Sequence, residues 1–269
     1  MNTIGFIGGG NMAEALIKGI VAAEIYAPEN VLVSDIRGEQ LEFLADNYGV
    51  TAAGSNSELT VKVETVVLSV KPQNMIDVLE GVKDSIGPET LVISIAAGIT
   101  VANLVAVLGE VAIIRVMPNT PALIGEGASA LFANDRAKPL LENAVSIFSS
   151  VGKAVVVDDE DLIDVVTAVS GSGPAYYFLL MEEMIKAGVE LGLSEDVAKD
   201  LVLQTARGAG LLATEADKNG ESPAELRRKV TSPGGTTEAA IRVFKKGKID
   251  ELVSAAITRA RQRSRELAK

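Results

Sequence analysis

Short apolar runs alternate with helical patterns through the first half of the chain. The runs at 66–70 and 91–95 contain no charged residue, which is typical of strands buried on both faces of a sheet. This alternation predicts an α/β fold, in which helices cover both faces of a doubly wound parallel sheet of seven or eight strands. Strands are predicted at 3–8, 31–35, 65–71, 90–96, 112–117, 128–133 and 153–157, with a helix beginning near Arg136.

The pattern changes after about Asp158, where the β-rich runs stop and helical spacing continues to the end. Ser222 and Glu225 form a capping-box sequence around Pro223, which predicts a helix from Pro223 through Arg228. We therefore predict two domains, an α/β domain at 1–158 and an all-α domain at 159–269. The other helices of the second domain are predicted at 161–170, 174–192, 195–215, 236–246 and 249–267.

The helix predicted at 174–192 is apolar on nearly every side in its first turns, at 175–181. Such a helix needs to be buried, and about 110 residues of helix offer little interior to bury it in. We therefore expect this half of the chain to form a homodimer or a higher homo-oligomer.

The chain has 269 residues, with 25 basic and 36 acidic side chains and a formal net charge of −11. This acidic balance disfavours nucleic acid as a partner. Cys and His are both absent, which excludes thiolate chemistry and removes the commonest metal ligand, so we predict no metal site. The sequence shows no signal peptide, and no apolar run approaches the roughly 18 residues that span a bilayer. We expect a cytoplasmic protein with no membrane partner.

A glycine-rich loop follows the first predicted strand directly. Gly8, Gly10 and Ala13 fit the pattern G-x-G-x-x-A between this strand and a helix. In dinucleotide-binding folds, the first glycine allows the tight turn, the second lets the backbone approach the pyrophosphate, and the third small residue permits close packing. The loop therefore predicts a nicotinamide dinucleotide cofactor.

The end of the second strand leaves the choice of dinucleotide open. Asp35 lies 22 positions beyond Ala13, near the interval of about 20 at which an acid meets the ribose 2′-hydroxyl of NAD. Ser34 and Arg37 flank it, and this pair suits the 2′-phosphate of NADP if Asp35 points away.

Other strand ends also carry candidate cofactor residues, because ligands bind beyond the carboxyl ends of strands in such sheets. They are Lys71 beside Pro72, the small pair Ala96 and Ala97, and Asn119 in a proline-flanked loop. Asn56 is a further candidate for the adenosine half of the cofactor.

In the helical half, Gly234 and Gly235 interrupt two helices among the hydroxyls of Ser232, Thr236 and Thr237. Backbone N–H groups turned outward at such a helix start suit a small carboxylate. Without His or Cys to donate a proton, the chain is better suited to reducing an iminium ion than a neutral ketone, because the iminium carries its own electrophilic charge.

With these motifs, the chain resembles the pyrroline-5-carboxylate reductase family from its first predicted strand to its last predicted helix. The segment at 229–237 is the most specific, because the family's signature runs from the helix at Pro223 through the Ser-Pro-Gly-Gly-x-Thr loop. The resemblance implies reduction of 1-pyrroline-5-carboxylate to L-proline, the last step of proline biosynthesis, by hydride transfer from NADPH or NADH. The matching segments lie at 4–13, 70–73, 94–99, 115–121, 170–176 and 229–237.

The resemblance also implies a Rossmann-type cofactor domain at 1–158 and a helical substrate-binding and dimerisation domain at 159–269. Together with the motifs, it assigns the cofactor to Gly8, Gly9, Gly10, Asn11, Met12, Ser34, Asp35, Arg37, Asn56, Val70, Lys71, Pro72, Ala96, Ala97 and Asn119. It assigns the substrate to Glu160, Ser232, Gly235, Thr236 and Thr237, with Thr237 as the candidate catalytic donor.

Two positions depart from the family pattern. Ser222 stands where many relatives carry His, and Lys229 stands where some carry an Asn that touches the cofactor. Two alternatives remain open at this point. A 3-hydroxyacid dehydrogenase would need a catalytic lysine such as Lys186 or Lys199, and a non-catalytic NAD(P)-sensing dimer would need only the cofactor site.

Overall fold

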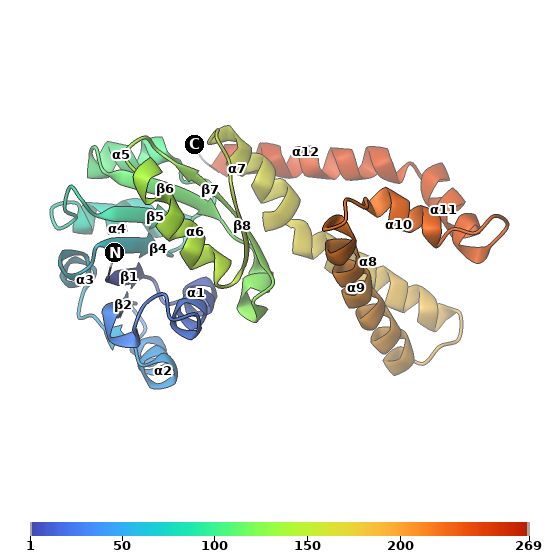
Figure 1. Cartoon of the computed structure of the whole chain (residues 1–269), viewed down its shortest axis with the longest axis horizontal. Coiled ribbons are helices and arrows are strands. Elements are labelled where there is room, and N and C mark those ends of the chain that lie inside the picture. The colour runs from blue at the N-terminus through green and yellow to red at the C-terminus, as the bar shows by residue number, and fades with distance from the viewer. Residues whose placement is uncertain (1, 268–269) are drawn as a thin grey trace. The chain divides into compact units, whose positions relative to one another are not determined.

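A computed structural model describes residues 2–267 (Figure 1). The chain divides into two compact units. The first contains the chain up to Pro174 together with the stretch from Ile257 onward, and the second is Ala175–Ala256. The boundary between a cofactor domain and a substrate domain at 158/159 stays a prediction.

The first unit is built on an eight-stranded sheet with the strand order β3-β2-β1-β4-β5-β6-β7-β8. In this order, the first six strands, β3 through β6, are all parallel. This arrangement confirms the predicted doubly wound α/β fold. The strands are β1 (Ile4–Ile7), β2 (Val31–Ser34), β3 (Thr51–Ala52), β4 (Thr65–Leu68), β5 (Leu91–Ser94), β6 (Ala112–Met117), β7 (Gly127–Ala133) and β8 (Gly152–Val156).

Helices pack on both faces of this sheet (Figure 1). Successive residues of β4 show the alternation, because Val67 belongs to one hydrophobic core while Val66 and Leu68 belong to the other. Each face therefore has its own apolar core. Helices α1 (Asn11–Ala22), α2 (Gly38–Tyr48) and α6 (Leu141–Ser149) contribute to the first core, and α3 (Asn56–Lys62), α4 (Met75–Val82) and α5 (Val101–Leu108) to the second.

Three details of the sheet differ from the prediction. Strand β3 was not predicted, because two residues are too short to show a period. Strand β7 runs antiparallel to β6, because the short connection between them leaves no room for the crossover that parallel strands need. The helix expected near Arg136 begins at Leu141, after a 3₁₀ turn at Lys138–Leu140. Pro139 disfavours the α conformation in the residue before it, which delays the helix.

The helix predicted at 161–170 changes its winding partway. Helix α7 (Asp161–Val166) continues as a π-helical turn at Thr167–Gly171. The N–H of Ser172 donates to the carbonyl of Thr167, five residues earlier, at 2.8 Å. Such single π turns occur frequently at functional sites.

The second unit is entirely helical and buries few of its own side chains. In α8, the exposed fraction is 67% for Tyr177 and 60% for Phe178. This apolar excess matches the expectation from the sequence. The helices are α8 (Gly173–Glu190), α9 (Glu195–Asp217), α10 (Pro223–Lys229), α11 (Thr236–Lys246) and α12 (Ile249–Leu267), the last of which ends in the first unit.

The predicted capping box at the start of α10 is confirmed. The Ser222 side chain accepts the N–H of Glu225, and the Glu225 carboxylate accepts the N–H of Ser222 at 2.8 Å. Within residues 2–267, no helix is both long and apolar enough to cross a membrane.

The pairing of β7 with β8 depends on a glycine. Gly152 has a φ of +147°, and a Cβ on it would overlap the backbone of Gly127 on the neighbouring strand. We expect Gly152→Ala to lower the free energy of unfolding by about 3 kcal/mol or more, through backbone strain and overpacking. The matched control is Gly81→Ala in α4, where a Cβ meets nothing within 4 Å and stability should rise by up to about 1 kcal/mol. Urea unfolding measures both, and equal effects would refute the argument.

Candidate functional site

The candidate cofactor residues follow the carboxyl ends of six neighbouring strands, β1 to β6. Strand β1 lies between β2 and β4, so the connections leave β1 and β4 in opposite directions along the sheet. In doubly wound sheets this switch point is where a dinucleotide binds. The fold thus gathers residues from six separate segments at one edge.

The glycine-rich loop occupies the switch point between β1 and α1. Gly8 has a φ of +98°, and a Cβ on it would lie 2.8 Å from the carbonyl oxygen of Ser69. Its N–H donates to the carbonyl of Ser34 at 2.7 Å. Gly10 caps α1 and has nothing within 4 Å of a Cβ position, while Ala13 is buried. Asn11 and Met12 form the first residues of α1, whose free N–H groups face the loop.

Asp35 connects the end of β2 to this loop. Its carboxylate accepts the N–H of Gly9 at 2.7 Å, and the N–H and Nε of Arg37 at 2.9 and 3.0 Å. Burial raises the pKa of Asp35, but the hydrogen bonds from Arg37 and Gly9 outweigh it and hold the pKa below its ordinary value. The carboxylate is therefore ionised at neutral pH and its charge is balanced by Arg37.

Ser34 and Asn56 meet beside this pair. The Ser34 hydroxyl donates to Oδ1 of Asn56 at 2.7 Å, which joins the end of β2 to the first residue of α3. The structure thus brings together the residues that the sequence suggested for the ribose 2′ position, Ser34, Asp35 and Arg37, and Asn56, which it suggested for the adenosine half of the cofactor.

The remaining strand ends supply small or exposed residues. Val70 lies next to the loop, with its Cγ1 3.2 Å from the position of a Cβ on Gly8. Lys71 is exposed, and Pro72 opens a 3₁₀ turn after β4. Ala96 is buried and Ala97 half-buried after β5.

Asn119, after β6, uses its side chain within the protein. Its Oδ1 accepts the N–H of Ala128 at 2.8 Å, and its Nδ2 donates to the carbonyl of Ser170 at 3.2 Å. These bonds tie the end of β6 to β7 and to the π-helical turn. Contact between Asn119 and the cofactor stays a prediction.

Glu160, which the sequence suggested for the substrate, is likewise held by protein groups. Its Oε1 accepts a hydrogen bond from Nη1 of Arg115 at 3.0 Å and another from the N–H of Val101 at 2.8 Å. Sequence reasoning missed Arg115, which is 2% exposed. A charged residue within the apolar run at 112–117 was the signal that could have revealed it.

In the second unit, the loop before α11 has the form expected of a carboxylate site. Gly234 has a φ of +73°, Gly235 caps α11, and Thr236 and Thr237 are its first residues. The N–H of Gly235 donates to the carbonyl of Ser232 at 3.0 Å. The loop therefore brings together four of the five residues that the sequence suggested for the substrate, while Glu160 lies in the first unit.

Glu238 is a member of this loop that sequence reasoning missed. Its Oε2 accepts the N–H of Gly234 and a hydrogen bond from Arg242, both at 2.8 Å. The N–H of Gly234 is thus bound by the protein's own carboxylate.

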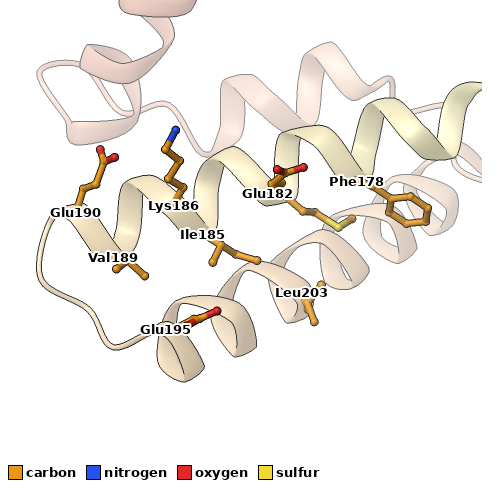
Figure 2. A pocket seen from close by; sticks show the side chains of 9 residues that line it. Phe178, Glu182, Ile185, Lys186, Val189, Glu190, Glu195 and Leu203 are labelled. Atoms are coloured by element: carbon orange, nitrogen blue, oxygen red, sulfur yellow. The ribbon is translucent and has the colours of Figure 1, made fainter.

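A separate hollow of about 610 Å³ lies along α8 and α9 (Figure 2). Ile185 and Val189 from α8 and Leu203 from α9 make it apolar, and Glu182, Lys186 and Glu190 lie on α8 beside them. Of the residues suggested by the sequence, only Lys186, a candidate of the dehydrogenase alternative, lines it within the described residues; none of the residues assigned to the nicotinamide cofactor or to the imine substrate does. The hollow belongs to the exposed apolar surface of the helical unit rather than to the candidate catalytic residues.

Comparisons with known proteins cover both halves of the chain. Residues 160–267 match the family model described as pyrroline-5-carboxylate reductase dimerisation. Residues 3–98 match the model described as NADP oxidoreductase, coenzyme F420-dependent.

Relatives of known name align over the full length. A pyrroline-5-carboxylate reductase from Pseudomonas aeruginosa is 48% identical, over 99% of this chain and 97% of its own. The solved pyrroline-5-carboxylate reductase from Coxiella burnetii is 40% identical with a TM-score of 0.94, over 100% and 99% of the two chains. The Plasmodium falciparum pyrroline carboxylate reductase, solved with NADP bound, is 32% identical with a TM-score of 0.87, over 100% and 98%. The chain belongs to the pyrroline-5-carboxylate reductase family.

Proposed function

We propose that this chain reduces 1-pyrroline-5-carboxylate to L-proline with a nicotinamide cofactor. The observation that carries the proposal is the pair of loops, one glycine-rich at the sheet switch point and one before α11, in a chain matched end to end by named reductases. The direct experiment follows the loss of nicotinamide absorbance with this imine. Cofactor binding without any turnover would overturn the proposal.

The loop before α11 accounts for substrate binding in this mechanism. The N–H groups at the helix start, with the hydroxyls of Ser232 and Thr236, hold the substrate carboxylate. The strand end at Ala96 and Ala97 would hold the nicotinamide, which would supply the hydride that the iminium carbon accepts. The electron pair of the C=N bond moves to the ring nitrogen, and Thr237 hydrogen-bonds this nitrogen as it becomes an amine.

We also propose that the chain works as a homodimer or a higher homo-oligomer, assembled through residues 159–269. The exposed Tyr177 and Phe178 of α8 and the apolar hollow of Figure 2 support this. A contiguous apolar surface of this kind marks an interface. A location in the cytoplasm stays a prediction.

For the cofactor we propose NADPH, with NADH as an alternative. Arg37 is about half-exposed, with 56% of its side chain accessible, so its guanidinium can reach a 2′-phosphate. Asp35 remains the natural partner of a ribose 2′-hydroxyl in NADH. Because Asp35 and Arg37 form an ion pair, the preference between NADPH and NADH depends on which of the two side chains contacts the cofactor.

Replacing Thr237 tests the donor role. Thr237→Ala removes the hydroxyl, and we expect kcat to fall by about 10- to 100-fold, because the hydrogen bond to the lone pair that forms on the ring nitrogen is lost. Thr237→Ser keeps the hydroxyl and should retain most of kcat. NADPH affinity, measured by fluorescence, should be the same in both variants. Unchanged turnover in Thr237→Ala would remove the donor role.

The ion pair at the end of β2 can be tested from both sides. Arg37→Ala should lower kcat/KM for NADPH by about 10-fold or more, since a charge-assisted bond to phosphate is lost. The rate with NADH should stay within about threefold of the native value, because the ribose hydroxyl meets Asp35 instead. Asp35→Asn should raise the ratio of kcat/KM for NADPH to kcat/KM for NADH. Equal losses with both cofactors in Arg37→Ala would contradict the assignment.

A further inference from the structure

The last turn of α12 docks on the first unit through a buried hydrogen bond. The Ser264 hydroxyl donates to Oδ1 of Asp164 on α7 at 2.6 Å. Their exposed fractions are 4% and 7%, and Ser264 is the one buried residue in the described part of α12. Figure 1 shows this end of α12, in red, beside α7. The end of α12 is therefore anchored at a defined point.

The same turn contacts the loop that follows β5. Gly98 is buried with a φ of +75°, and a Cβ on it would lie 3.1 Å from the backbone and from Cβ of Leu267. Only a glycine accepts so close an approach in that backbone conformation. The end of α12 thus packs directly on the turn next to Ala96 and Ala97.

The other end of this loop is held from α7. Glu160, which precedes α7, accepts the N–H of Val101 at 2.8 Å. Val101 is the first residue of α5, and Thr100 caps that helix. The loop from Ile95 to Thr100 is therefore braced at Gly98 by α12 and at Val101 by the residue that precedes α7.

Charged groups connect the two braces. Arg115 on β6 lies 3.0 Å from Glu160 and 3.8 Å from Asp164. Arg265 on α12 lies 2.8 Å from Asp161 and 3.6 Å from Asp164. A buried guanidinium needs its carboxylates, so Arg115 fixes Glu160 and Asp164 and, through them, the end of α12.

We propose that the turn at 264–267 is a positioning element for the loop at 95–100, so that docking of this turn and binding of the nicotinamide favour each other. The inference rests on the proposed function in one respect, the placement of the nicotinamide near Ala96 and Ala97. Ser264 and Leu267 act through the loop and touch no reacting atom. By linkage, a cofactor that binds better to the braced loop also stabilises the brace.

The first test measures backbone hydrogen exchange in the native protein, with and without NADPH and without any imine. We expect saturating NADPH to slow exchange at 257–267 by about threefold or more, as the reciprocal effect of coupled sites requires. Helix α6, which packs on the face of the sheet opposite to α5, is the internal control, and its exchange should change less. An equal change at α6 and at 257–267, or no change at 257–267, would overturn the proposal.

The second test compares two serine substitutions in α12. Ser264→Ala should weaken NADPH binding by about threefold to tenfold, because the lost buried hydrogen bond to Asp164 releases the turn that packs on the loop at Gly98. Ser254→Ala makes the same change at an exposed position of the helix and should leave NADPH affinity unchanged. A Ser264→Ala protein that melts earlier but binds NADPH with native affinity would show a structural role alone and overturn the proposal.

These tests separate the inference from the proposed function. Both tests measure effects of NADPH binding, which requires no imine substrate. If the native protein binds NADPH and reduces no imine, the proposed function fails while the coupling can still be measured. If it reduces the imine and both serine variants bind NADPH equally well, the coupling fails alone.

Discussion

The edge of the sheet that carries the candidate cofactor residues depends on how closely the backbone just after β1, at Gly8, approaches the ends of the two neighbouring strands. The N–H of Gly8 donates to the carbonyl of Ser34 on one side, at 2.7 Å. On the other side, the carbonyl oxygen of Ser69 would lie only 2.8 Å from a Cβ on Gly8, which is too close for any side chain. This approach puts the next residue, Gly9, within reach of Asp35, which in turn fixes Arg37. One absent side chain thereby orders the ends of three strands.

A buried charge organises another part of this edge of the sheet, near the end of β6. Arg115 lies on a central strand at 2% exposure, where its guanidinium costs free energy unless carboxylates compensate it. Glu160 and Asp164 do so, and both also hold other backbone or side-chain groups. A buried ion pair adds little net stability, but removal of one partner is costly, so its geometry is strongly specified. The charge therefore ties distant segments to one arrangement without making the unit more stable.

The sequence predicted the sheet, its helices and the glycine-rich loop, because periodicity and glycine spacing are local signals. It did not predict the contacts between residues that lie far apart in the sequence. The contacts of Asn119 with Ser170 and of Arg115 with Glu160 span 51 and 45 positions, so no local pattern could show that both side chains are bound by protein groups. The late start of α6 could have been predicted from Pro139. Strand β3 could not have been predicted, because two residues are too few to show a hydrophobic period.

The two loops of the proposed mechanism sit in very different surroundings. The glycine-rich loop is fixed by a sheet with a core on each face. The loop of Thr237 belongs to a helical unit in which α8 and α11 bury almost none of their side chains. Local bonds such as those of Glu238 can shape this loop, but a helix is held in place mainly by packing of its apolar face. In the proposed mechanism, the loop of Thr237 would therefore depend on burial that the helical unit does not supply within one chain, so the proposed association of subunits would be part of the construction of the site.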